Sequence, residues 1–524
     1  MGRSGNRPAS RVWKGAAGLL VRCPGWTTCL LPILLAALVC GTGSALELRV
    51  NGGPTDRSFD VLSRTWEPWT YIDSGRRVPG YPLAEVLPLM DDLWRLTVRG
   101  VDGEVHRWSE DRLDSYLRWR LIQDGTGWTL ISADGRRISN VTEIAAEGRR
   151  SVPGTLEVWI GWEGTDRVER LIRRFADIHD QDITVLVVPS ILSKVSSTAR
   201  GRGRLPDLFM VQSDYLPSLV AAGLIQRLDG MDNGALLEKG RDAFTRDAGL
   251  WARPLYFDTQ LVFYNPRLVA PPPEDWDLDD LERILTDLKR RGTAPITWNA
   301  YSAYWLISFQ FGFGKDGLLE SDGGLVIDDE PTREALGYLL DLQERGLLGV
   351  REREGMMGRF VTGDVGLILS GSYSIPAFDE ADVSYAVSPY PRNPGTGAPL
   401  APLLDFKGLA VSRRTYRPIL ARSLAAYLTE TGVQAHLAAG LSKLPADTEA
   451  LEMMRRGLSE RPHAEALLAS YDIGTVLPPN DVYPIFKNTM WKMLSFAFTG
   501  QLGVDELLEQ GQRIIDEKLE RRSP

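Results

Sequence analysis

The sequence predicts an α/β protein with two α/β units, preceded by a small, mostly β domain. From about residue 153 the chain alternates strand-like and helix-like segments. Residues 46–150 instead hold short alternating runs separated by Asp-Gly pairs, which are typical of β-hairpins. Residues 250–265, LWARPLYFDTQLVFYN, form one long strand-like stretch between the two α/β units. We expect the chain to cross there from one unit to the other.

Length and composition are those of a globular protein with several domains. The 524 residues suggest two or three domains of about 150 residues each. Hydrophobic residues make up 43% and charged residues 25%, which is ordinary for a folded protein. The formal net charge is -9, and an acidic protein is a poor candidate for binding nucleic acid or an anionic membrane surface.

The first 45 residues have the pattern of a secretory signal peptide. Five basic residues and no acidic ones precede the apolar run 30–39, and Gly43-Ser44-Ala45 then offers a small-x-small cleavage site. The apolar run is short for a membrane span. We expect export to the periplasm or to the outer face of the cytoplasmic membrane, with an uncleaved N-terminal anchor as the alternative. Removing this segment takes the formal charge from -9 to -14.

All three cysteines, Cys23, Cys29 and Cys40, lie within that segment. A mature chain beginning near Leu46 would therefore contain no disulfide and no thiolate site. Cys40 is a possible lipid anchor, although residues 37–39 lack the small residue expected beside a lipoprotein cleavage point.

The first α/β unit is expected to have a mainly parallel sheet with helices on both faces, because its elements follow βαβα order. Thr165 is placed to cap a helix whose apolar residues recur at helical spacing. The expected elements are a strand at 155–161, a helix from Thr165, a strand at 183–188, a helix at 191–200, a strand at 207–211 and a helix ending near Gly223.

Polar and aromatic residues follow two of these strands. In open α/β sheets ligands bind at the carboxyl ends of the strands, so residues in these loops are candidates for ligand binding. Asp166 has an alternative role as a helix-start carboxylate, and Asp214 has one as a helix cap. The loop residues are Trp162, Glu163 and Asp166 after the first strand, and Gln212, Ser213 and Asp214 after the third.

The second α/β unit is rich in aromatic residues. About half of them are expected in the core. Tyr304 or Trp305 beside Trp298 nevertheless gives flat apolar faces with polar tips, which suit sugar rings. The expected elements are a helix at 278–291, a strand at 294–298, an aromatic segment at 299–314, a helix at 331–348 and a strand at 364–370.

The last third of the chain is mainly helical. Before it, the strand-like segment 405–412, DFKGLAVS, suggests that the chain crosses back to the first unit. We therefore expect discontinuous domains. Helices are expected at 421–428, 434–441, 448–458, 487–498 and 504–521.

Five segments in the same order resemble the extracellular solute-binding proteins of ABC importers, in particular the maltose-binding branch. They are LEVWIGWEGTDRVERLIRRFADIHDQDITVLVV, GRLPDLFMVQSDYLPSLVAAGLIQRL, LWARPLYFDTQLVFYN, GRFVTGDVGLILSGSY and GQLGVDELLEQGQRIIDEKL. The resemblance implies a two-lobed, type II-like periplasmic-binding-protein fold with a hinge. It implies a first lobe at 151–262 and 385–470, a second lobe at 263–384, and C-terminal helices at 471–524 that close the hinge side.

The same resemblance implies a ligand site. Asp258 falls where the family places a carboxylate that accepts sugar hydroxyls, and Asp214 falls on its first-lobe loop acid. Tyr304 and Tyr373 fall on second-lobe aromatics that bind the sugar. The full set of candidate ligand-binding residues is Trp162, Asp166, Asp214, Tyr256, Asp258, Tyr304, Trp305, Tyr373, Phe486 and Trp491.

This chain also departs from the family pattern. Val211 and Ser302 stand where the maltose-binding protein has a stacking Trp and a sugar-binding Glu, and Lys487-Asn488 replaces an aromatic pair. These departures argue against maltodextrin itself as the ligand. Nearby Phe486 or Trp491 would then supply an aromatic surface.

The implied function is capture of a carbohydrate, most simply an oligosaccharide, and its delivery to the membrane permease subunits of an ABC importer. We expect a monomer without a cofactor or metal. A sensory protein that presents its ligand to a membrane receptor is an alternative, and a secreted glycoside-acting enzyme is another. Against an enzyme, the chain has no nucleophile elbow, no His-Glu-x-x-His pair and no phosphate loop, and its four histidines are scattered.

Overall fold

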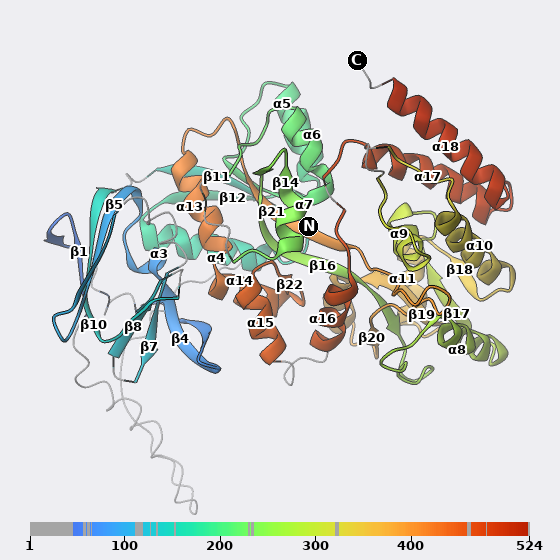
Figure 1. Cartoon of the computed structure of the whole chain (residues 1–524), viewed down its shortest axis with the longest axis horizontal. Helices are drawn as coiled ribbons and strands as arrows, with labels where there is room; N and C mark the ends of the chain where they lie inside the picture. The colour runs from blue at the N-terminus through green and yellow to red at the C-terminus, as the bar shows by residue number, and fades with distance from the viewer. Residues whose placement is uncertain are drawn as a thin grey trace, which may run out of the picture. The chain divides into compact units, whose positions relative to one another are not determined.

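The computed structural model describes most of the chain after residue 45 (Figure 1). The expected signal peptide and all three cysteines lie outside the described residues. Within the described part, no helix combines the length and apolar character needed to cross a bilayer. The described residues are 46–521 except 56–58, 60–62, 64, 110–118, 126, 133–134, 151–153, 229–230, 232–234, 320–323, 458–462 and 478.

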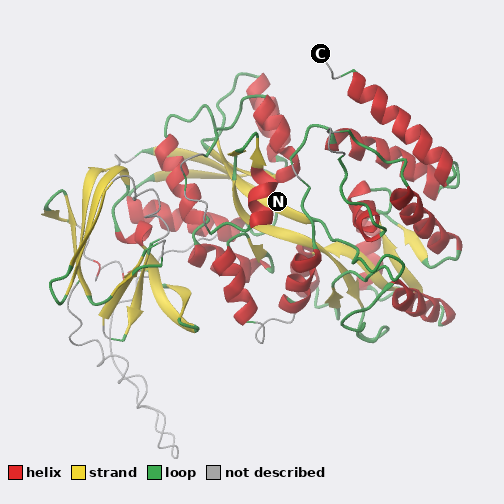
Figure 2. Ribbon diagram, in the orientation of Figure 1, coloured by secondary structure: helices red, strands yellow, loops and turns green. Residues whose placement is uncertain are grey.

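The N-terminal domain consists of two five-stranded sheets around a shared core, so the expectation of a mostly β domain is confirmed (Figure 2). Tyr81, Trp108 and Trp119 are among its buried aromatic residues. One sheet has the order β2-β1-β10-β5-β6, with β1 (Glu47–Val50), β2 (Gly53–Pro54), β5 (Met90–Gly100), β6 (Val105–Ser109) and β10 (Val141–Arg150). The other has the order β3-β4-β7-β8-β9, with β3 (Trp69–Asp73), β4 (Arg76–Pro82), β7 (Arg120–Asp124), β8 (Gly127–Ile131) and β9 (Arg137–Ile138); the short helix α3 (Leu83–Val86) follows β4.

The rest of the chain is built on a ten-stranded sheet with the order β12-β11-β13-β21-β16-β19-β17-β18, in which β20 and β22 also pair with β16. Its strands are β11 (Thr155–Ile160), β12 (Asp182–Val187), β13 (Leu208–Gln212), β16 (Arg253–Tyr264), β17 (Ala294–Trp298), β18 (Leu348–Val350), β19 (Val365–Gly371), β20 (Ala386–Ser388), β21 (Leu404–Val411) and β22 (Leu444–Pro445). A separate hairpin joins β14 (Thr245–Arg246) to β15 (Gly249–Leu250).

The sheet is mixed, and the expectation of a mainly parallel sheet is wrong at its centre. The outer strands β12, β11 and β13 are parallel to one another, as are β18, β17 and β19. The central pairs of β13 with β21, β21 with β16, and β16 with β19 are antiparallel. The reason is that β16 runs from the first unit into the second, whereas β21, where the chain has returned to the first unit, runs antiparallel to it.

Strand β16 is the crossing strand that the sequence predicts, and all twelve of its residues are buried. Its first part, from Arg253 to Thr259, pairs with β21 of the first lobe. Its second part, from Gln260 to Tyr264, pairs with β19 of the second lobe. Asp258 therefore lies where the backbone passes from one lobe to the other.

Helices cover the sheet in both lobes (Figure 1). Most of the predicted helices are confirmed, but α7, α11, α12 and α16 were not predicted, and Gly164 rather than Thr165 is the N-cap of α4. The first-lobe helices are α4 (Thr165–His179), α5 (Ile191–Arg200), η3 (Ser213–Tyr215), α6 (Leu216–Ala221), α7 (Glu238–Phe244), α13 (Pro418–Leu428), α14 (Thr431–Leu441), α15 (Thr448–Arg456) and α16 (Ala464–Ile473). The others are α8 (Leu278–Arg290), α9 (Ala303–Gly312), α10 (Glu330–Glu344), α11 (Arg353–Val361), η4 (Ser372–Ser374), α12 (Ile375–Glu380), α17 (Tyr483–Phe498) and α18 (Val504–Glu520).

The two C-terminal helices contribute to the second lobe. Helix α17 packs against α9, and α18 packs against α17 and α10. Figure 1 shows α17 and α18 beside these second-lobe helices. Side chains of α17 that point toward the first lobe therefore reach it from the second lobe.

The N-terminal domain is joined to the first lobe by a buried ion pair. Arg174 of α4 donates from Nε and Nη2 to the two carboxylate oxygens of Glu85, at 2.8 and 2.7 Å. Its guanidinium also lies over the rings of Trp66 and Trp69, 5.4 and 4.3 Å from their centroids. Arg174 is therefore largely buried, although it belongs to a basic stretch, residues 170–174, whose pattern alone is typical of a solvated helix face.

Two further contacts join the same surfaces. The Tyr71 hydroxyl donates to Glu430 at 3.0 Å, and Glu430 in turn accepts the first backbone N–H groups of α14. Arg120 pairs with Glu449 of α15 at 2.6 Å. The N-terminal domain therefore contacts α4, α14 and α15 through charged or hydrogen-bonded pairs.

Candidate functional site

Asp258 is the centre of a buried ionic network between the lobes. Its side chain is 1% exposed. Oδ1 accepts hydrogen bonds from Lys443 Nζ at 2.5 Å and Ser372 Oγ at 2.7 Å, and Oδ2 lies 3.7 Å from Lys407 Nζ. Burial alone would raise the pKa of the Asp258 carboxyl, but Lys443 and Lys407 hold the pKa below its ordinary value. Asp258 is therefore ionised and compensated by two cations.

The two lysines extend this network toward the first-lobe loops. Lys407 Nζ lies 2.6 Å from Asp405, which also accepts a bond from Gln212 Nε2 at 2.7 Å. Lys443 Nζ lies 3.2 Å from Glu163. Burial would lower the pKa of Lys407, but Asp405 and Asp258 hold it above its ordinary value. Three carboxylates thus surround two ammonium groups.

The position of Asp258 differs from that of a carboxylate exposed to a ligand. Lys443 and Lys407 belong to the first lobe, whereas Ser372 belongs to η4, which follows the second-lobe strand β19. One side chain on the crossing strand therefore binds groups from both lobes. Its primary effect is to fix the geometry where the lobes meet.

A divided cavity lies beside this network. The smaller part has a volume of about 60 Å³ and is lined by side chains from both lobes, including Asp214, Tyr304 and Asp405. A second part of about 250 Å³ shares Leu477 and Tyr483 with the first and continues toward α9. The complete lining of the smaller part is Gln212, Ser213, Asp214, Tyr304, Leu403, Leu404, Asp405, Leu477, Pro479, Asn480 and Tyr483.

Asp214 lines the cavity, and one of its carboxylate oxygens is buried. Within the described chain, its buried Oδ1 has no hydrogen-bond partner, whereas Oδ2 lies 3.5 Å from Lys487 Nζ of α17. Burial raises the pKa of Asp214 to about 6, although nearby Lys487 acts in the opposite direction. Because Asp214 is in the first lobe and Lys487 is on a second-lobe helix, this ion pair also spans the two lobes.

Tyr304 lines the same cavity from the second lobe. The hydroxyl is buried and has no partner among the described residues. The Tyr304 backbone is held by a 2.7 Å bond from Gln260 Nε2 of β16, and its ring meets that of Trp305 edge to face at 5.0 Å. Burial raises the pKa of Tyr304 well above its ordinary value, so the hydroxyl remains protonated.

Trp162 and Tyr373 lie close to charged groups around the network. The Trp162 ring lies 5.8 Å from Lys407 Nζ, and its backbone has a positive φ of 63°. The Tyr373 ring lies 5.0 Å from the guanidinium carbon of Arg353. Both are partly buried, and neither lines the small part of the cavity.

The remaining candidate residues do not line either part of the cavity. Asp166 is 67% exposed on its side chain and pairs with Arg170 one turn along α4. Tyr256 and Phe486 are buried in the core, and Trp305 is almost fully buried. Trp491 is 44% exposed and meets the Tyr301 ring instead. The helix-start role of Asp166 therefore accounts for its position.

Several residues of the network were not among the candidates. Asp405 and Lys407 lie two positions apart in a strand, so both side chains face one side of the sheet, and this spacing was a usable signal. Lys443 is a single lysine in an apolar segment and gave only a weak signal. Asn480 and Tyr483 come from a loop and the first turn of α17, where the sequence pattern carries little information.

The chain matches the family described as bacterial extracellular solute-binding protein over residues 170–466. It is 24% identical over 292 residues to the maltodextrin-binding protein MdxE of Bacillus subtilis (strain 168), covering 53% of this chain and 68% of that protein. It is 23% identical over 314 residues to the galactooligosaccharide-binding protein of the same organism, covering 57% of this chain and 73% of that protein.

Solved structures with a similar fold include the GacH receptor of Streptomyces glaucescens, with a TM-score of 0.63 and 19% identity, covering 71% of this chain and 99% of that one. The maltotriose binding protein of Thermus thermophilus has a TM-score of 0.61 and 19% identity, covering 70% of this chain and 100% of that one. These likenesses confirm the two-lobed fold that the sequence predicts.

Proposed function

The chain belongs to the bacterial extracellular solute-binding protein family, and from that membership we propose that it captures an oligosaccharide between its two lobes and delivers it to the membrane subunits of an ABC importer. One observation carries the choice of ligand class. Asp214 and Tyr304 line the same cavity from opposite lobes, and among the described residues a carboxylate oxygen of the first and the hydroxyl of the second have no hydrogen-bond partner. Sugar hydroxyls both donate and accept hydrogen bonds, so adjacent hydroxyls satisfy both groups.

The relatives support this choice of ligand class. The two Bacillus subtilis proteins are named for binding maltodextrin and galactooligosaccharide, and the Thermus thermophilus structure contains maltotriose. All the reported relatives are binding proteins or receptors, which favours capture over catalysis. We assign ligand contact to Asp214, Tyr304, Tyr483 and Asn480, and positioning of the cleft to Asp258 and its two lysines.

A change in the separation of the lobes is part of this proposal. The small part of the cavity, at about 60 Å³, is well below the roughly 300 Å³ at which ordinary small-molecule sites begin. A sugar bound there needs the lobes to separate for its entry and to approach again around it. Because such a ligand contacts both lobes, it favours the closed arrangement, which the importer subunits would recognise. We propose that a monomer acts in this way outside the cytoplasmic membrane.

The substitution Tyr304→Phe tests the donor. It removes the unpaired hydroxyl and leaves the ring in place, so we expect the Kd for the bound oligosaccharide to rise about tenfold while the melting temperature without ligand stays the same. Isothermal titration calorimetry measures the first quantity and calorimetric unfolding the second. Tyr338→Phe is the matched control, because within the described part of the chain its hydroxyl is also buried without a partner, and Tyr338 does not line the cavity. Equal affinities for both variants and the wild type would remove Tyr304 from the site.

The pH dependence of affinity tests the acceptor. Ionised Asp214 accepts sugar hydroxyls at both oxygens, so bound sugar favours the carboxylate and lowers its pKa below the free value of about 6. We expect affinity to be constant above pH 7 and to fall by up to about tenfold per pH unit below pH 6. In Asp214→Asn the affinity should be lower, and its pH dependence should disappear between pH 5 and 7.

Without ligand, the titration of Asp214 makes the folding stability fall as the pH rises, which is opposite to its expected effect on ligand affinity. The folded-state pKa of about 6 exceeds the ordinary value of 3.8, so between these values the folded chain holds a proton that the unfolded chain has lost. The contribution of Asp214 to stability is therefore present below pH 3.8 and is lost as the pH rises through 6.

A wild-type ligand affinity that is independent of pH from 5 to 8 would show that Asp214 does not accept a hydrogen bond from the ligand.

A further inference from the structure

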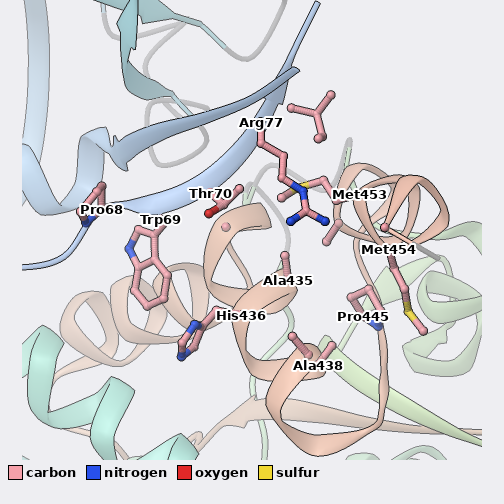
Figure 3. Close-up of a pocket in the computed structure, with 15 residues that line it drawn as sticks. Pro68, Trp69, Thr70, Arg77, Ala435, His436, Ala438, Pro445, Met453 and Met454 are labelled. Carbon is pink, nitrogen blue, oxygen red and sulfur yellow. The ribbon is translucent and has the colours of Figure 1, made fainter. Parts of the chain in front are cut away.

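A groove of about 260 Å³ lies between the N-terminal domain and the first lobe, away from the ligand cavity (Figure 3). One side is formed by strand β3, from which Trp69, Thr70 and Ile72 line the groove. The other side comes from α14 and α15, including Ala435 and Met453. Figure 3 shows Trp69 and Thr70 of β3 beside α14, with the Trp69 ring directed toward His436.

Strand β3 is an edge of its sheet, and its hydrogen-bonding pattern follows from the turn beside it. Ser74 and Gly75 both have positive φ, 47° and 80°, as in the two-residue turn of a tight hairpin. The flanking residues Asp73 and Arg76 therefore form a hydrogen-bonded pair, and the pairs along the ladder alternate from there. Thr70 and Ile72 fall in the non-hydrogen-bonded pairs, so their backbone N–H and C=O groups point away from β4.

A proline confirms this register. Pro79 is opposite Thr70 and has no N–H, which suits a position where the ladder requires none from it. In the described chain, no turn, loop or side-chain hydrogen bond reaches the outward groups of Thr70 or Ile72. An edge of this kind is a template for an added strand.

The groove is a fixed feature because the two surfaces are joined beside it. At Gly432 they are so close that a Cβ atom would lie 2.9 Å from Trp69 Cβ and from the Tyr71 hydroxyl. The ion pair between Glu85 and Arg174 also holds the domain against α4. The groove therefore does not arise from loose packing of the N-terminal domain against the first lobe.

We propose that an extended peptide segment of a partner protein adds to β3 as a new edge strand. The outward groups of Thr70 and Ile72 offer two donors and two acceptors to its backbone. Its inward side chains enter the space bounded by Ala435 and Met453, so small or apolar residues fit there. Arg76 is exposed at the hairpin end, and its charge favours an acidic residue at that end of the segment. This role is independent of ligand capture in the cleft.

Fluorescence polarisation of the full chain with labelled peptides tests the proposal. The probes are two fluorescein-labelled hexapeptides of alternating valine and threonine, one with glutamate at its first position and one at its last. The substitution Thr70→Pro removes one outward N–H without breaking a ladder bond, whereas Thr70→Val keeps that N–H. We expect one peptide to bind the wild type and Thr70→Val within twofold of each other, and to bind Thr70→Pro at least tenfold more weakly.

Modified peptides provide a second arm that needs only the wild-type chain. Two N-methylated versions of the peptide are compared, each with one of the two sets of alternate amides blocked. We expect methylation of the amides that face β3 to abolish binding, and methylation of the amides that face away from β3 to leave it unchanged. Replacing glutamate with lysine should weaken binding severalfold. Equal binding to Thr70→Pro, equal binding of the two methylated versions, or no polarisation change with either peptide overturns the proposal. So does a wild-type dimer in sedimentation that Thr70→Pro converts to monomer, because a second copy would then occupy the edge.

Discussion

Replacing Asp258 with alanine is expected to lower the free energy of unfolding by about 3–5 kcal/mol, because it leaves buried cations without their shared counter-charge. Lys443 and Lys407 are both almost inaccessible to water, and Asp258 lies 2.5 Å from the first and 3.7 Å from the second. Lys407 keeps Asp405 as a partner, whereas among the described acidic residues Lys443 keeps only the more exposed Glu163. Urea denaturation followed by circular dichroism measures the change.

Two other variants separate charge from packing at this position. Ser372→Ala removes one neutral partner of Asp258 and should cost about 1 kcal/mol. The double substitution Asp258→Leu with Lys443→Met removes the anion and the cation together, so we expect it to be less destabilising than Asp258→Ala alone. A cost below about 1 kcal/mol for Asp258→Ala would contradict the view that Asp258 holds the lobe junction together.

Replacing Glu85 with alanine is expected to have a similarly large effect, about 3–5 kcal/mol, at the contact between the N-terminal domain and the first lobe. Arg174 would remain between two tryptophan rings without the carboxylate that accepts two of its N–H groups. We expect hydrogen exchange to accelerate in residues 69–82 and in α4, while the lobe junction around Asp258 keeps its protection.

Arg170→Ala is the matched control for this experiment. Arg170 lies on the same helix, one turn before Arg174, but it is exposed and pairs with exposed Asp166. Exposed pairs of this kind contribute at most about 0.5 kcal/mol on a helix. If Glu85→Ala behaved like Arg170→Ala in both unfolding and exchange, the N-terminal domain would not be held by this ion pair.

Local patterns predicted most of the elements that position the site. Strand β16 was recognisable from its long run of bulky apolar residues, and helix α5 was predicted with its observed ends. Helix α16 was missed, because the sequence around Ala464–Ile473 is apolar on more than one side and shows little helical periodicity. The central antiparallel pairs of the sheet were also missed, since strand direction depends on how distant segments return to the sheet.

The chemistry of the site was less accessible to sequence reasoning than its location. Asp258 was correctly expected at the junction of the lobes, but its neutralisation depends on Lys407 and Lys443, which are about 150 and 185 residues away along the chain. Arg174 looked like its solvated neighbours because Glu85, its partner, lies 89 residues earlier in another domain. Burial and pairing of charges are long-range properties, so a local charge pattern alone does not reveal them.

Binding of an oligosaccharide by residues 46–524 is the most direct test of the central proposal. Residues 46–524 should be titrated by calorimetry with maltotriose, maltotetraose, galactooligosaccharides, monosaccharides, short peptides and polyamines, with tryptophan fluorescence and melting temperature recorded in parallel. We expect at least one oligosaccharide to bind at one site with a micromolar Kd, equivalent to about -8 kcal/mol, to change the fluorescence and to raise the melting temperature. No response to any sugar, together with saturable binding of a peptide or polyamine in the cleft, would contradict the carbohydrate assignment.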